Sequence, residues 1–208
     1  MTSVLSNLAR AGLPAAILVL TGSASAQTLA GAALVKALQG GGYVLIMRHA
    51  SSPQAPPTAA EADPENTGHE RQLDDTGRRT AGAMGAALKA LHLPIRQVWS
   101  SPAYRARETV RLAGLPMPTT TAELGDRGQS MKATSEEQST WLKAKAAERP
   151  AAGTDTVVIT HFPNINAAFG AAAVGIEDGE ALVFHPTGGA TPALVGRIKI
   201  EDWPKLVP

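Results

Sequence analysis

Tyr43-Val44-Leu45-Ile46-Met47-Arg48-His49 is the stretch of sequence that decides the fold. Its first five residues carry no charge and favour extended structure. Such a continuous apolar run is typical of a strand buried on both faces in a parallel sheet. The run ends abruptly at Arg48 and His49. We therefore predict a central strand whose carboxyl end presents a polar pair.

The chain on either side of this stretch alternates between helical and strand patterns. We predict helices over residues 29–38, 75–91, 101–113, 135–148 and 163–173, strands over residues 97–100, 119–122 and 156–160, and a final hairpin of residues 181–185 and 193–200. The second helix is expected to be capped by Asp75 or Thr76, and the third to open at Ser101 and Pro102. Strands alternating with helices indicate an α/β fold, a three-layer sandwich around a mostly parallel central sheet.

Residues 50–73 fit neither pattern. They are rich in proline and in small or polar residues. We expect them to form a long loop, which in a compact domain is usually functional or mobile. His69 and Arg71 lie there and could touch a substrate, although mobile surface residues are the commoner outcome.

Composition excludes several classes of function. The chain has 208 residues, of which 44% are hydrophobic and 18% charged, enough for one globular domain. Its 19 Lys and Arg against 18 Asp and Glu leave a net charge of +1, which gives no long-range attraction for nucleic acid or an acidic membrane. With no cysteine there is no disulfide, thiolate nucleophile or Cys-ligated metal.

The N-terminal 26 residues have the order of a secretory signal peptide. Arg10 is their only charge, an apolar run extends from Ala11 to Leu20, and Ala24-Ser25-Ala26 supplies the small-residue cleavage pattern. The apolar run is too short to be a stable membrane anchor. We expect cleavage near Ala26, a mature domain over residues 27–208, and a periplasmic or secreted location. The alternative is a retained helix packed on the domain.

Polar residues follow three of the predicted strands. They are Arg48 and His49, Ser100 and Ser101 with Arg105 one turn further, and His161. In open α/β sheets, ligands bind beyond the carboxyl ends of the strands. Two guanidinium groups would repel a metal ion, but they suit a phosphoryl group whose oxygens accept bidentate hydrogen bonds while an imidazole attacks phosphorus. The residues therefore predict phosphoryl transfer with no metal and no cofactor.

Four segments also resemble, in order, the motifs of the histidine phosphatase superfamily, which has the phosphoglycerate mutase-like fold. The segments are Arg48-His49-Ala50, the helix start at residues 73–81, residues 100–109 with Arg105, and residues 157–161. The resemblance spans residues 43 to about 200, and chance is a poor explanation for four matches in family order.

The resemblance implies a mechanism position by position. His49 would be the nucleophile that becomes phosphorylated, Arg48 and Arg105 would bind the phosphoryl oxygens, and His161 would complete the pocket. The chain would then be a metal-independent phosphomonoesterase of the histidine acid phosphatase type, acting on a small phosphorylated substrate. A non-catalytic module that binds phosphorylated ligands is the alternative, and the presence of His49 favours the enzyme.

The general acid is where this sequence departs from the family. Some branches of the family have an Asp directly after the second His, and this chain has Phe162 at that position. We therefore prefer Glu180 as the acid, ahead of Glu123 or Asp126. An enzyme with no acid would favour good leaving groups such as phosphohistidine. The Gly-Glu-Ala sequence that ends at Ala181 resembles the same segment of exported relatives that act on sugar phosphates of the cell envelope. A sugar phosphate is therefore a second candidate substrate.

Overall fold

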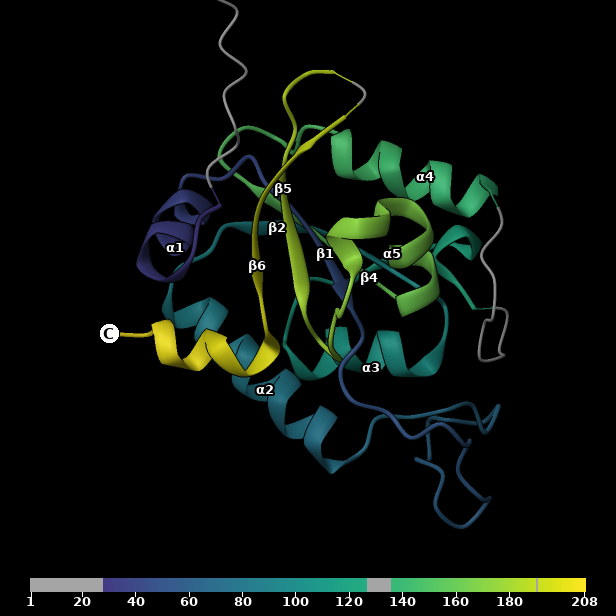
Figure 1. Cartoon of the computed structure of the whole chain (residues 1–208). Coiled ribbons are helices and arrows are strands. Elements are labelled where there is room, and N and C mark those ends of the chain that lie inside the picture. Colours follow the sequence, from purple (N-terminus) through teal and green to yellow (C-terminus); the bar gives the residue numbers. More distant parts are fainter. Residues whose placement is uncertain (1–27, 127–135, 190) are drawn as a thin grey trace, which may run out of the picture.

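The computed structural model describes residues 28–126, 136–189 and 191–208, so the expected signal peptide lies outside the described residues. The described chain forms a six-stranded sheet flanked by helices (Figure 1). In sheet order the strands are β3 (Thr119–Thr120), β2 (Ile95–Ser100), β4 (Asp155–Thr160), β1 (Val44–Arg48), β5 (Ala181–His185) and β6 (Ala193–Ile198).

The sheet is mostly parallel, as the sequence predicts. Strand β1 pairs in parallel with β4, and β2 pairs in parallel with both β4 and β3. Strand β5 runs antiparallel to β1 and forms the predicted hairpin with β6. The three strands predicted to carry polar residues at their ends are therefore adjacent and point the same way.

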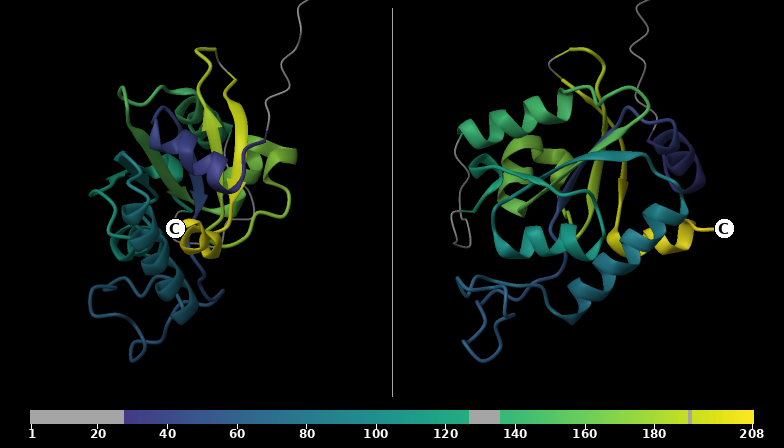
Figure 2. Two further views of the ribbon diagram at one scale, coloured as in Figure 1. Left: turned by 90° about the vertical axis from the view of Figure 1, so that its left-hand side faces the viewer. Right: turned by 180° about the vertical axis from the view of Figure 1, so that it is seen from behind.

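Helices cover both faces of the sheet, giving three layers (Figure 2). One face packs against α1 (Gly31–Gln39), α2 (Asp75–Ala90), α3 (Tyr104–Leu112) and the 3-10 segment η3 (Ile200–Leu206). The other packs against α4 (Glu136–Ala147), α5 (Phe162–Phe169) and the short 3-10 segments η1 (Ala122–Leu124) and η2 (Gly170–Ala173).

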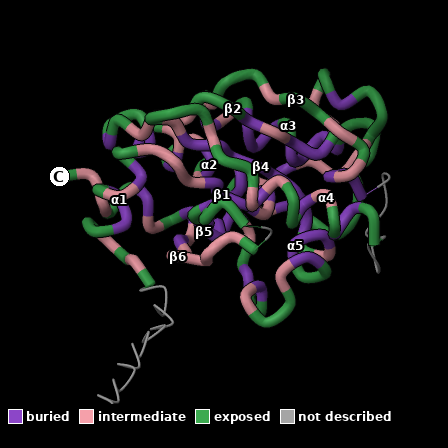
Figure 3. The backbone as a smooth tube through the Cα atoms, turned by 90° about the horizontal axis from the view of Figure 1, so that it is seen from above, coloured by how far each residue is buried: buried purple, intermediate pink, exposed green. Residues whose placement is uncertain are grey.

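Strand β1 shows why the sheet needs both layers. Leu45 and Met47 belong to the apolar cluster on the α2 side, and Val44 and Ile46 belong to the cluster on the α5 side. Successive side chains of a strand point to opposite faces, so an uninterrupted apolar run is stable only where both faces are covered. All four are buried, as Figure 3 shows for the centre of the sheet.

Helix boundaries differ from the predictions in three places. The N-cap of α2 is Asp74, whose carboxylate accepts the Gly77 N–H at 2.7 Å, and neither Asp75 nor Thr76 caps it. Helix α3 begins at Tyr104 because the hydroxyl of Ser101 accepts the Ala103 N–H and forms a turn before the helix. The last predicted helix divides into α5 and η2 at Gly170, which has a φ of 49°.

The predicted loop at residues 50–73 contains neither helix nor strand and extends beyond the carboxyl end of β1 (Figure 1). Its own polar side chains hold it together. The Asn66 side chain donates to the Glu70 carbonyl at 2.7 Å and accepts the Glu70 N–H at 2.9 Å, and it is 2% exposed. Buried polar groups satisfied in this way fix the backbone of a loop.

None of the helices in the described part of the chain is long and apolar enough to cross a membrane.

Candidate active site

The carboxyl ends of β1, β2 and β4 bring the predicted polar residues together. The His49 N–H donates to the Thr160 carbonyl at 3.0 Å, so the residue after β1 lies beside the residue before His161. The Ser101 N–H donates to the Ile159 carbonyl at 2.9 Å. The rings of His49 and His161 lie 5.2 Å apart, centroid to centroid.

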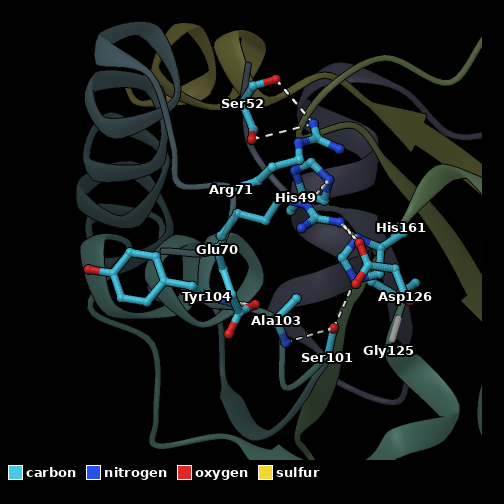
Figure 4. A network of polar contacts seen from close by, with 12 residues as sticks. His49, Ser52, Glu70, Arg71, Ser101, Ala103, Tyr104, Gly125, Asp126 and His161 are labelled. Atoms are coloured by element: carbon cyan, nitrogen blue, oxygen red, sulfur yellow. Dashed lines mark hydrogen bonds and ion pairs between the residues drawn. The ribbon is translucent and has the colours of Figure 1, made fainter. Parts of the chain in front are cut away.

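Arg105 joins the two imidazoles of His49 and His161, which Figure 4 shows. It lies in the first turn of α3 and is 3% exposed. Its Nε–H donates to His49 Nε2 at 3.0 Å and its Nη2 donates to His161 Nδ1 at 2.9 Å. The same Nη2 forms an ion pair with the buried carboxylate of Asp126. One guanidinium thus sets the positions of both rings.

These hydrogen bonds assign the tautomer of each imidazole. Because His49 Nε2 accepts from Arg105, the proton of His49 lies on Nδ1, which donates to the Ala50 carbonyl at 2.8 Å. His161 has the other tautomer, since its Nδ1 accepts from Arg105 and its Nε2 donates to the Ser101 hydroxyl at 2.8 Å. The lone pair of His49 Nε2 therefore points at Arg105.

Both imidazoles are neutral. Burial lowers the pKa of His49 well below the usual value, and electrostatic interactions with His161, Arg105 and Arg48 lower it further. Burial likewise lowers the pKa of His161, with Arg105, Arg71 and Arg48 adding to the effect. At neutral pH, His49 offers a lone pair to an electrophile without first losing a proton.

Arg48 lies at the edge of this group. Its Nη2 forms an ion pair with Asp178 at 2.6 Å, its Nη1 donates to the Ile176 carbonyl at 3.3 Å, and its side chain is 22% exposed. Asp178 precedes β5, the antiparallel neighbour of β1. The turn that leads into the antiparallel strand thus supplies the partner that holds Arg48 in place.

A cavity of about 170 Å³ lies between these residues. Its lining consists of Arg48, His49, Gln54, Arg71, Arg105, Asp126, His161, Phe162 and Pro163. Two larger surface clefts, one along α3 and one beside α4, have no histidine among their described lining residues. Of these three, the small cavity is the one whose described lining combines neutral imidazoles with guanidinium donors.

Arg71 is a wall residue that the sequence analysis ranked too low. Its Nε donates to the Pro53 carbonyl at 2.6 Å and its Nη2 to the Ser52 carbonyl at 3.3 Å, which directs the guanidinium from the 50–73 loop towards the cavity (Figure 4). The sequence signal that could have identified it was an arginine in the long loop that follows the strand with Arg48 and His49.

The three acid candidates are placed differently. The Glu180 carboxylate pairs with Arg197 at 2.8 Å and accepts the Glu177 N–H at 2.9 Å, and Glu180 does not line the cavity. The Glu123 carboxylate accepts from Thr121 and lines the cleft beside α4. Asp126 alone of the three is a cavity residue. The preference for Glu180 therefore has no support from the geometry.

No group of three or more His, Cys, Asp or Glu side chains gathers as metal ligands within the described ranges. The charged side chains of the cavity wall are three arginines and one aspartate. Guanidinium groups donate hydrogen bonds to oxyanions in a fixed planar geometry. The arrangement is suited to hold a doubly charged phosphoryl group.

Comparison with known proteins places this site in a family context. The sequence model of the histidine phosphatase superfamily (branch 1) matches residues 44–127. The solved protein histidine phosphatase SixA complexed with tungstate is 20% identical, and its match covers 77% of this chain and 98% of that chain with a TM-score of 0.54. The phosphoserine phosphatase of Entamoeba histolytica complexed with 3-phosphoglyceric acid is 13% identical, covering 74% and 95% with a TM-score of 0.52.

At these identities the solved structures show a shared fold and no more. No curated protein sequence matches the chain.

Proposed function

We propose that the chain, whose residues 44–127 match the sequence model of the histidine phosphatase superfamily, is a member of that family and removes phosphoryl groups from small substrates through a phosphohistidine formed at His49, without a metal ion. The matched segment includes Arg48, His49 and Arg105. One observation carries the proposal: a neutral His49, whose Nε2 lone pair faces Arg105, lines a cavity whose wall includes three arginines.

In the first step, the phosphoryl oxygens take over the hydrogen bond that Arg105 gives to His49 Nε2. The freed lone pair attacks phosphorus, the P–N bond forms, and the bond from phosphorus to the leaving atom breaks with its electron pair. The ring gains positive charge, which the hydrogen bond from Nδ1 to the Ala50 carbonyl stabilises. In the second step water adds to phosphorus and the P–N bond breaks, returning its electron pair to Nε2.

The arginines supply what a metal ion supplies in other phosphatases. Arg48, Arg71 and Arg105 place donors around the transferring group, where charge spreads over the oxygens in the transition state. These donors are fixed before substrate binds, because Arg48 is held by Asp178 and Arg71 by the carbonyls of the loop. Preorganised donors lower the barrier without reorganisation during the reaction.

The site favours substrates whose leaving group needs no proton. Asp126 is the acid candidate in the cavity, and its carboxylate is engaged in an ion pair with Arg105. Phosphohistidine fits this condition, because its imidazole departs as a neutral ring when the ring nitrogen that is not bonded to phosphorus carries a proton. An alkyl phosphate such as a sugar phosphate does not fit it. The solved SixA of this fold is described as a protein histidine phosphatase and was solved with tungstate, a tetrahedral oxyanion.

Assays of phosphoramidate and para-nitrophenyl phosphate hydrolysis test the proposal. With a chelator present, the full chain should turn over both substrates, and His49→Asn should lose at least about a thousandfold in kcat/KM. His92→Asn is the matched control, because His92 is exposed and Asn tolerates its φ of 52°. Activity that needs a metal ion, or that survives in His49→Asn, contradicts the mechanism. Binding of phosphate without turnover would indicate a binding module.

We also propose that residues 1–26 direct export and are removed. The mass of the protein purified from cells tests this, since cleavage after Ala26 leaves a chain that begins at Gln27. An intact N-terminus would overturn it.

A further inference from the structure

Phe162 is an exposed aromatic side chain at the mouth of the cavity. It is the first residue of α5, follows His161 directly, and keeps 40% of its surface exposed. Three residues further along the same helix, Ile165 is completely buried in the core. The start of α5 therefore leaves a large ring in solvent beside the group that receives the phosphoryl.

Burial separates the cavity into a floor and a rim. The floor residues His49, Arg105, Asp126 and His161 are each at most 3% exposed. On the rim, Gln54 and Phe162 are exposed and Pro163 is half-buried, and none of the three is charged. Of the three arginines, Arg105 lies in the floor and Arg48 and Arg71 are partly exposed, while the part of the rim formed by Gln54, Phe162 and Pro163 is neutral and partly apolar.

The size of the cavity places the leaving group at the rim. Its volume of about 170 Å³ is well below the roughly 300–1,000 Å³ of sites that enclose a whole organic ligand. A phosphoryl group bonded to His49 occupies the floor. Whatever departs from phosphorus must then extend outwards across the rim, where Gln54, Phe162 and Pro163 lie.

Arg48 fixes the ring of Phe162 in position. The guanidinium carbon of Arg48 lies 5.8 Å from the centroid of the ring, within the range of a cation–π contact. Arg48 is itself held by Asp178 and by the Ile176 carbonyl. A ring that is held in place beside a phosphate-binding arginine offers its exposed surface to a second ring at little cost in side-chain entropy.

We propose that Phe162 determines specificity by stacking on a planar aromatic leaving group bonded to phosphorus. This inference rests on the proposed function and names its substrate class: phosphoryl groups carried on an aromatic ring, either imidazole through a P–N bond or an aryl group through a P–O bond. Aromatic pairs prefer offset or edge-to-face arrangements with centroids roughly 4.5–7 Å apart. Stacking positions the leaving group in line with His49 Nε2 and needs no proton donor at the rim.

The test compares substrates with and without a ring. Phosphohistidine and phenyl phosphate carry a ring, whereas phosphoramidate and acetyl phosphate do not. Phe162→Leu keeps an apolar side chain of similar reach and removes the ring, and it should lower kcat/KM for the two ring substrates by about two- to tenfold. The same variant should lower kcat/KM for phosphoramidate and acetyl phosphate by a smaller factor, because these substrates lose at most the effect of the contact between Phe162 and Arg48. Phe162→Tyr, which keeps the ring, should restore the preference.

Val174→Ala is the matched control, because Val174 is 69% exposed and does not line the cavity. A loss for phosphohistidine alone would identify imidazole as the ring, and equal losses for both ring substrates would identify any planar ring; either result supports the proposal. Equal losses for substrates with and without a ring, or no loss for any, would overturn it while the proposed function stands. A wild-type chain that turns over none of the four substrates would overturn the proposed function and this inference together.

Discussion

Arg78→Met should destabilise the protein through a carboxylate far from water. The side chain of Glu108, in α3, is completely buried, and its two oxygens accept from Arg78 and from the Leu73 N–H. Arg78, in α2, also donates to Asp63 at 3.1 Å. This ion pair joins α2, α3 and the end of the 50–73 loop. Helix α3 carries Arg105, so the pair also supports the active site.

The expected magnitude follows from the burial of the two partners. Removing one partner of a fully buried ion pair costs about 3–5 kcal/mol. The side chain of Arg78 is 30% exposed, so water can approach the site once the guanidinium is gone. The Leu73 N–H also remains as a donor to Glu108. We therefore expect a loss of about 2–3 kcal/mol in the free energy of unfolding at neutral pH.

The loss should depend on the charge of Glu108. Burial raises the pKa of Glu108 in the folded protein, so the fold favours the neutral carboxyl relative to the unfolded chain. The stabilisation of the fold by the neutral Glu108 carboxyl is fully present below the pKa of Glu108 in the unfolded chain. It is lost as the pH rises through the pKa of Glu108 in the folded protein. Without Arg78 that dependence becomes steeper, so the deficit of Arg78→Met should shrink towards about pH 4. Adding Glu108→Gln should recover about 1 kcal/mol or more at neutral pH.

Urea unfolding followed by tryptophan fluorescence measures these differences. Arg79→Met is the control, because Arg79 is an exposed residue of the same helix and should change stability by less than about 0.5 kcal/mol. The reasoning is refuted if Arg78→Met costs no more than this control. It is also refuted if the double variant loses the full sum of the two single losses.

Three further predictions follow from single contacts. Because the pKa of His49 lies well below its usual value, kcat/KM corrected for substrate ionisation should stay level as the pH falls from about 8 to 6.5, and a half-maximal loss at pH 6.5 would contradict a neutral nucleophile. Burial raises the pKa of Asp155 to about 7, so the urea midpoint should fall as the pH rises through about 7; Asp155→Asn, which can still accept the Tyr43 N–H, should abolish that dependence. A Cβ on Gly77 would lie 2.1 Å from the Ser51 carbonyl oxygen, so Gly77→Ala should cost about 1–3 kcal/mol in stability and also lower activity, because Ser51 is two residues from His49; unchanged thermal unfolding would show that the backbone yields.

The order of elements could be predicted from the sequence because each depends on local pattern. The apolar run from Val44 to Met47 requires cover on both faces wherever it lies, and the predicted helices and strands are found close to their expected positions. The predicted α/β fold with a mostly parallel sheet is confirmed. Errors occurred at helix ends, where a side chain one residue away can take over the cap, as Asp74 does for α2.

The site was predicted in part. The sequence marked the residues that follow three strands, since their place depends only on where each strand ends. Two features were out of its reach. Arg71 reaches the cavity because the loop folds on carbonyls of residues 52 and 53, and the Glu180 carboxylate turns to Arg197 on the neighbouring strand.

The linear chain by itself determined the alternation of strands and helices and the identity of the groups at the strand ends, because periodicity and residue chemistry are carried by neighbouring positions. Only the tertiary structure decided which charges meet. Arg105 contacts both imidazoles and Asp126, and Arg48 pairs with Asp178, through contacts between residues far apart in sequence. Burial at that junction then sets the protonation of both histidines, because desolvation is a property of the packed interior and of no single segment.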